Sequence, residues 1–183
     1  MTGVVKGLLA YVSSAVAIGS LLSGPTSYPF GDLQQAIVAE LYRALTFYIT
    51  PLSSALGDGL TVTRFGFTIS TSHGIYPLLG LLMAGLLSGL CAGRSGNLIS
   101  PLLGSSLVFG LWQLTGFYLL PQLFGQYEWV SVLNRFNEFL LLSKPLELVA
   151  LFSVPLIVAI PAGMLAEPSA KGPEPLFYRG ARR

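Results

Sequence analysis

Residues 75–93 read IYPLLGLLMAGLLSGLCAG, and Arg94 follows directly. No charged residue occurs over these 19 positions, and a helix needs about 20 mainly apolar residues to cross a bilayer. The stretch therefore predicts a membrane-spanning helix, and it is the clearest one in the chain.

The small residues of this stretch recur every four positions. Four residues make just over one turn of an α-helix, so residues at this spacing form a stripe on one face. Membrane helices associate by close packing, and small side chains let two backbones approach. We expect the stripe to pack against another helix, either within the chain or in an oligomer. Its members are Ala84, Gly85, Ser88, Gly89, Ala92 and Gly93.

The composition of the whole chain also favours a membrane protein. Of its 183 residues, 52% are hydrophobic and only 10% are charged, against about 25% charged residues in an ordinary soluble domain. A soluble surface with so few charges would expose large apolar patches and aggregate. The length suits one compact domain, which we place at residues 1–166.

Three further stretches predict spans, namely residues 4–22, 98–124 and 146–165. The second of them is uncharged throughout and long enough to cross a membrane with tilt. The third contains Pro155 and Pro161, which predict kinks because proline removes a backbone hydrogen bond. In the first, residues 15–17 read Ala-Val-Ala, so a cleaved signal peptide is an alternative to a retained span.

Two stretches are amphipathic. Asp32 is a suitable N-cap for a helix over residues 33–50, in which Glu40 and Arg43 share a face and can pair. An ion pair in hydrocarbon is costly, so we place this helix at the interface or partly embedded, with a fifth span as the alternative. Residues 126–142 have an aromatic-rich apolar face, which fits either the headgroup boundary or a cap over the bundle.

Residues 56–73 differ from the rest of the chain. A Gly-Asp-Gly turn at residues 57–59 precedes a partly alternating run of β-branched and aromatic residues, which predicts a short extended segment. One such segment is too little for a membrane barrel. The predicted fold class is therefore all-α: a polytopic transmembrane bundle with four spans, five being possible, and two amphipathic helices.

Lysine and arginine residues indicate the orientation, because they are more frequent in cytoplasmic loops. With four spans, six of them fall on one side and four on the other, so we expect both termini in the cytoplasm. Residues 167–183 are expected to form an extended basic tail. The six are Lys6, Arg94, Lys171, Arg179, Arg182 and Arg183, and the four are Arg43, Arg64, Arg135 and Lys144.

Reactive side chains are few. Cys91 is the single cysteine and His73 the single histidine, so this chain alone does not provide the ligands of a typical zinc site. We expect His73 in a loop or at the interface, without a bound metal or pigment. The sequence contains neither a phosphate-binding glycine loop nor a nucleophile elbow. We therefore expect no catalytic, cofactor-binding or metal-binding residues, no enzyme activity and no nucleic-acid surface.

Two functions remain open from the sequence. The first is a non-catalytic membrane subunit or scaffold of a multi-subunit complex, which would contact the bilayer, other subunits or copies of itself. The second is a small oligomeric transporter or channel component, with Gln113, Glu40 and Arg43 as its polar groups. The helix predicted over residues 33–50 discriminates between them. A place beside a cavity inside the bundle favours transport, and a place flat on the surface favours the scaffold.

Overall fold

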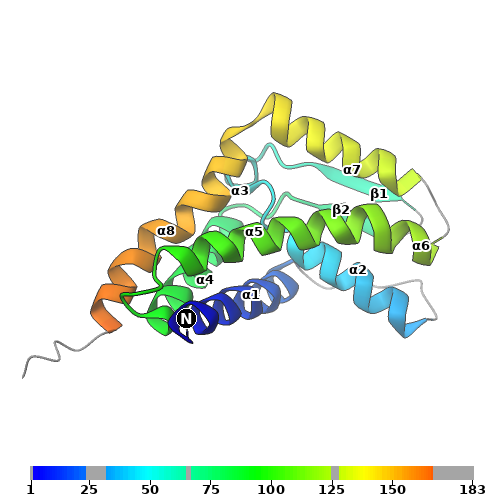
Figure 1. Cartoon of the computed structure of the whole chain (residues 1–183). Helices are drawn as coiled ribbons and strands as arrows, with labels where there is room; N and C mark the ends of the chain where they lie inside the picture. Colours follow the sequence, from blue (N-terminus) through cyan, green and yellow to red (C-terminus); the bar gives the residue numbers. More distant parts are fainter. Residues whose placement is uncertain (1, 24–31, 65–66, 125–127, 167–183) are drawn as a thin grey trace, which may run out of the picture.

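The computed structural model describes residues 2–23, 32–64, 67–124 and 128–166, which are mostly helical (Figure 1). Its elements are α1 (Thr2–Leu22), α2 (Leu33–Thr46), α3 (Pro51–Leu56), β1 (Thr61–Arg64), β2 (Phe67–Ser70), α4 (Tyr76–Ala92), α5 (Ile99–Leu114), η1 (Thr115–Leu119), α6 (Leu120–Phe124), α7 (Glu128–Glu138), η2 (Phe139–Ser143) and α8 (Leu146–Ala166). The π-helical segments η1 and η2 continue α5 and α7. The predicted all-α class is confirmed, with one short hairpin added to it.

Four helices, α1, α4, α5 and α8, form a bundle. Among them, α4 packs most extensively against α8 and α1. The start of α1 at Gly3 contacts the end of α4 at Ala92. Gly163, near the end of α8, contacts Asn97 in the turn between α4 and α5. Both ends of the described chain therefore lie at the same end of the bundle (Figure 1).

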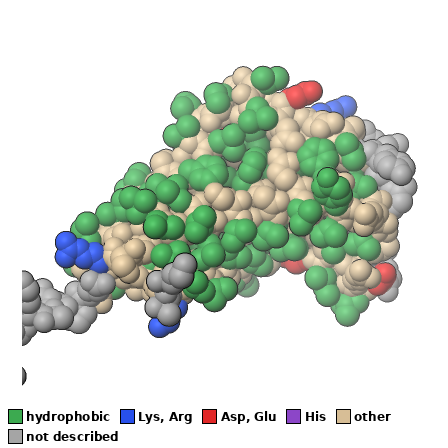
Figure 2. Space-filling view, viewed as in Figure 1, with side chains coloured by type: hydrophobic (Ala, Val, Ile, Leu, Met, Phe, Trp, Pro, Cys, Tyr) green, Lys and Arg blue, Asp and Glu red, His purple; other side chains and the backbone are tan. Residues whose placement is uncertain are grey.

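Among the described residues, three helical stretches are long and apolar enough to cross a membrane, namely Gly3–Leu22, Ile99–Leu123 and Leu146–Ala166. Helix α4 is also apolar, but its 17 residues fall short of the roughly 20 that a span requires. Helix α8 continues through both of its prolines without ending. Hydrophobic side chains cover much of the face in Figure 2, and charged side chains lie toward its edges.

Shorter elements cover the end of the bundle that lies away from the two ends of the described chain, and we call them the cap. The cap comprises α2, α3, the hairpin, α6 and α7. Trp112 lies in its core, where its ring stacks on Tyr42 and meets Phe136 edge-on, with both centroid distances at 6.1 Å. The indole Nε1 donates to Thr46 Oγ1 at 2.9 Å, so its single donor is satisfied.

The prediction of one helix over residues 33–50 is wrong in its last part. Its start is as expected, with Asp32 as N-cap, but α2 ends at Thr46 and a tight turn follows. Pro51 accounts for the break, because proline disfavours helical backbone at the preceding residue, and Thr50 has φ −127° and ψ 63°. Pro51 then occupies the first turn of α3, so it begins a helix as well as ending one.

The other amphipathic stretch turns its apolar face into the protein. Within the predicted range 126–142, the residues of this face are buried against the cap core, so this helix covers the end of the bundle. They are Trp129, Val132, Leu133, Phe136 and Leu140. Residues 126–127 and the predicted tail at 167–183 lie outside the described residues.

The extended segment expected within residues 56–73 is a two-stranded antiparallel hairpin. Thr61 is opposite Ser70, and Arg64 is opposite Phe67. Ile69 is fully buried and belongs to the core, and β2 contacts α2. The hairpin therefore forms part of the cap.

Candidate functional site

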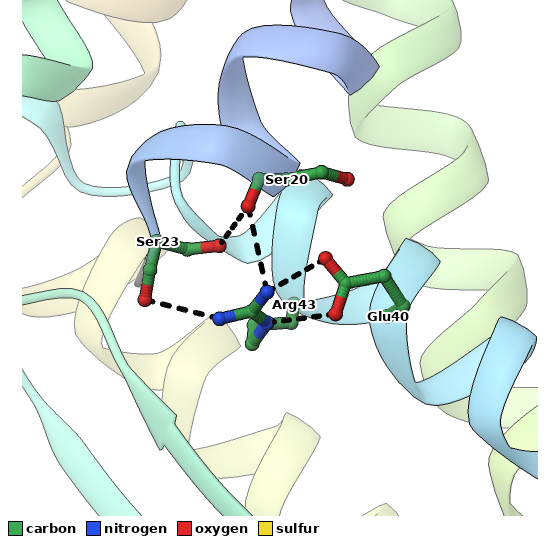
Figure 3. A network of polar contacts seen from close by, with 4 residues as sticks. All are labelled: Ser20, Ser23, Glu40 and Arg43. Carbon is green, nitrogen blue, oxygen red and sulfur yellow. Dashed lines mark hydrogen bonds and ion pairs between the residues drawn. The ribbon is translucent and has the colours of Figure 1, made fainter. Parts of the chain in front are cut away.

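Glu40 and Arg43 form the ion pair that their spacing predicts, and Arg43 also binds the end of α1 (Figure 3). Its Nη2 donates to Glu40 Oε1 at 2.6 Å and its Nε to Glu40 Oε2 at 3.1 Å. The same guanidinium donates to the carbonyl oxygens of Ser23 at 3.1 Å and Ser20 at 3.5 Å. Carbonyls at a helix C-terminus lack partners within the helix, so Arg43 caps α1.

The burial of this pair explains how α2 tolerates a cation. The side chain of Arg43 is 7% exposed and that of Glu40 is 30% exposed. An unpaired buried charge costs several kcal/mol, but here the guanidinium is bound by a carboxylate and by the negative end of a helix. A Cβ on Gly19 would collide with the carbonyl of Ala44, so the two backbones also touch. The pair therefore fastens the end of α1 to α2.

A groove of about 420 Å³ lies between α1 and α2 beside this ion pair. Its volume is within the range of about 300–1,000 Å³ that is usual for small-molecule sites. It is open at the protein surface and does not enter the bundle. Its walls are apolar except for one hydroxyl and one carboxylate, and its lining residues are Val16, Ser20, Ala36, Ile37, Glu40 and Leu41.

Glu147 is a buried carboxylate, and the sequence did not reveal its partners. It lies in the first turn of α8, is 1% exposed, and accepts from the amides of Leu52 at 2.8 Å and Ser53 at 2.6 Å. The hydroxyl of Ser53 donates to the same carboxylate. Glu147 therefore caps the N-terminus of α3, where backbone amides lack partners within the helix. The one signal in the sequence was a lone carboxylate that opens a long apolar helix.

Gln113, which the transport alternative names as a polar group, faces protein. Its Nε2 donates to Asn137 Oδ1 at 2.7 Å, and Asn137 Nδ2 donates to Gln113 Oε1 at 3.4 Å. Two carboxamides can satisfy one another in this reciprocal way. The pair joins α5 to α7 and lies in the cap.

The glycines of the small-residue stripe of α4 lie against α8 of the same chain, whereas Ala92 lies against Gly7 of α1 and Ser88 bonds to Ser100 of α5. A Cβ on Gly85 would lie 2.7 Å from Pro155 Cα, and a Cβ on Gly89 would lie 2.7 Å from Ala159 Cα. Real Cβ atoms essentially never come so close, so only glycine fits at these two crossings. Of the other stripe residues, Ala84, Ser88 and Ala92 are buried and Gly93 is half-buried.

His73 lies in the loop between β2 and α4. Its Nε2 is 2.8 Å from the carbonyl oxygen of Ser70, and its ring centroid is 5.0 Å from that of Phe47. Burial lowers the pKa of His73; the bond to Ser70 opposes this shift, and the positive charge of Arg43 adds to it. Within the described ranges, no three His, Cys, Asp or Glu residues are placed to hold a metal ion.

We expect acidification to destabilise the protein through His73. Its pKa in the folded chain is below the ordinary 6.5, so the unfolded chain binds the proton first as the pH falls. The stability that the neutral ring contributes is complete above pH 6.5 and is lost below that value. Melting temperatures measured from about pH 7.5 to about pH 5.5 should therefore fall less for His73→Gln than for the wild type. Parallel pH profiles would contradict this role.

Comparisons of the chain with protein-family models, with curated proteins and with solved structures gave no match. The fold itself defines a class, namely a mostly helical protein whose described part has three apolar helices of membrane-spanning length.

Proposed function

We propose that this chain is a multi-pass membrane protein with four spans, and that it serves as a non-catalytic subunit of a larger membrane complex. The three long apolar helices and the shorter α4 are the spans. They are free of charged residues except for Lys6 and Glu147, which lie close to helix ends. An even number of spans places both termini on one side, and the basic residues at that end favour the cytoplasm.

The strongest support for a non-catalytic role is the way in which buried polar groups are used. Within the described ranges, Arg43 and Glu147 are the buried charged residues, and each binds the end of a helix of the same chain. Gln113 is bound to Asn137. Transport and catalysis require polar groups that are directed toward a substrate. Here the same groups hold helices to one another, which is the requirement of a packing subunit.

The position of α2 also bears on the transport alternative. The C-terminal part of α2 is buried against the bundle, whereas Leu33 and Ile37 in its N-terminal part are 75% and 59% exposed. The groove beside Glu40 opens at the surface and not inside the bundle. The C-terminal part of α2 is thus packed into the protein, and the groove that adjoins its ion pair is a surface groove, which favours the scaffold over transport.

An exposed apolar corner formed by α3, η2 and the start of α8 supports docking to a partner. Leucines gather on the segments that meet at the ion pair between Lys144 Nζ and Asp58 Oδ2, whose length is 2.9 Å. Exposed apolar patches of this kind mark interaction sites. We name this surface the leucine corner, and it consists of Leu56 (78% exposed), Leu141 (57%), Leu142 (79%) and Leu146 (67%).

Purification of the full-length protein in mild detergent from its native membrane tests this proposal. We expect it to co-purify with at least one other membrane protein. Leu142→Asp should release that partner without lowering the melting temperature, because the side chain is exposed in the isolated chain. Gln122→Asp is the control, because Gln122 is exposed on α6 away from the leucine corner, and this variant should retain the partner. A monodisperse 19.5 kDa monomer without a partner would overturn the assignment.

Membrane insertion has a separate test. After alkaline carbonate extraction of the native membrane, the protein should remain with the lipid pellet, because its apolar helices favour hydrocarbon over water. Its release into the supernatant would show that the apolar surface contacts another protein instead of lipid.

A further inference from the structure

We infer that the groove between α1 and α2 holds one acyl chain of a membrane lipid whose headgroup donates hydrogen bonds to Glu40. The inference deepens the proposed function and rests on the membrane insertion proposed there. It assigns a ligand to a surface that the packing of the chain leaves open.

The apolar part of the groove is suited to an acyl chain. Val16, Ile37 and Leu41 present aliphatic side chains, and the groove is open along the surface. Ile37 itself is 59% exposed, and Leu33, which lies one turn earlier on the same face of α2, is 75% exposed. Water finds few hydrogen-bond partners on such walls, so an aliphatic ligand is favoured there.

The location of the groove favours a ligand that comes from the bilayer. Val16 and Ser20 belong to the last two turns of α1, which is one of the helices of spanning length. A chain that leaves the groove therefore continues along the uncharged face of a span. A lipid can enter sideways from the membrane, whereas a soluble ligand would have to displace lipid first.

The charge beside the groove selects the headgroup. The carboxylate of Glu40 is the more exposed half of the ion pair, and Arg43 points away toward the carbonyls of Ser20 and Ser23 (Figure 3). The side chain of Glu40 is 30% exposed and lines the groove, so a hydrogen-bond donor in the groove can reach its carboxylate. A primary ammonium group donates such bonds, whereas a quaternary ammonium group has no N–H. A headgroup with only negative charge would be repelled.

Native mass spectrometry of the full-length protein in detergent tests this inference. Phosphatidylethanolamine and phosphatidylcholine with identical acyl chains are supplied in equal amounts. We expect one phosphatidylethanolamine to bind per chain. Its binding constant should exceed that of phosphatidylcholine by about tenfold, which is the contribution of one charge-assisted hydrogen bond to affinity. Glu40→Gln should reduce that preference, because the charge of the acceptor is lost.

Two tryptophan variants separate the groove from the rest of the surface. Ile37→Trp fills the groove and should abolish retention of both lipids. Ile157→Trp makes the same substitution at an exposed site of α8, outside the groove and the leucine corner, and should bind as the wild type does. Melting temperatures show whether each variant is folded. If Glu40→Gln does not fold, Ile37→Trp still tests whether the groove binds lipid.

The lipid-binding and carbonate-extraction experiments test the lipid site and membrane insertion separately. Equal retention of both lipids by the wild type, or undiminished retention by Ile37→Trp, overturns the lipid site. If the protein remains in the carbonate pellet, membrane insertion stands even when the lipid site fails. Release by carbonate refutes membrane insertion and the lipid site together.

Discussion

Replacing Glu147 by alanine is expected to lower the free energy of unfolding by about 3–5 kcal/mol, because each buried donor without an acceptor costs about 1–3 kcal/mol. The change leaves the amides of Leu52 and Ser53 and the hydroxyl of Ser53 without their acceptor. Denaturant titration of the protein in mixed micelles measures this loss.

The size of the loss separates two roles for Glu147. If the carboxylate only favoured the N-terminus of its own helix, its removal would cost about 0.3–1 kcal/mol. Glu138→Ala is the control, because Glu138 is exposed on α7 and its loss should cost about 0.5 kcal/mol or less. A loss below about 1 kcal/mol for Glu147→Ala would contradict its role as the cap of α3.

Gly89→Leu should prevent α4 and α8 from closing on one another. The new Cβ would lie 2.7 Å from the Cα of Ala159 and still closer to its carbonyl oxygen. Backbone atoms cannot turn aside as a flexible side chain does, so we expect a cost above the usual range of about 1–3 kcal/mol for overpacking. Size-exclusion chromatography and the melting temperature in detergent measure the effect.

Gly110→Leu is the matched control for this substitution. Gly110 lies in the apolar helix α5, and no atom lies within 4 Å of a Cβ placed there. We expect the melting temperature to stay the same or rise, because leucine favours a helix by up to about 1 kcal/mol over glycine. Equal behaviour of the two variants would show that α4 and α8 do not touch at Gly89.

The sequence predicted the four bundle helices well, because a long apolar stretch without charge has few stable conformations other than a buried or membrane-embedded helix. The ranges 4–22, 75–93, 98–124 and 146–165 each agree with a helix or a continuous helical run to within a few residues. The partner helix of the glycine stripe was not predictable. Regular spacing shows that a face is smooth, but it does not identify the helix that lies on it.

The sequence was less informative about contacts between distant segments. The pairing of Glu40 with Arg43 follows from helix geometry, because both residues are on one turn. The bonds from Arg43 to the carbonyls of α1, and from residues 52–53 to Glu147, join segments that only the tertiary fold brings together. The break at Thr46 required the same knowledge, since Pro51 marks a boundary but not how many preceding residues leave the helix.

The packing of α8 on the glycines of α4 has a consequence for biosynthesis. The two partners are separated by the whole of α5, the cap helix α7 and their connections, so a ribosome completes α4 long before it makes Leu146. Until then, the bare backbone at Gly85 and Gly89 has no partner from its own chain. Helix α8 therefore completes the bundle, and a nascent chain that is stalled before α8 presents a groove that a chaperone or a neighbouring subunit can recognise.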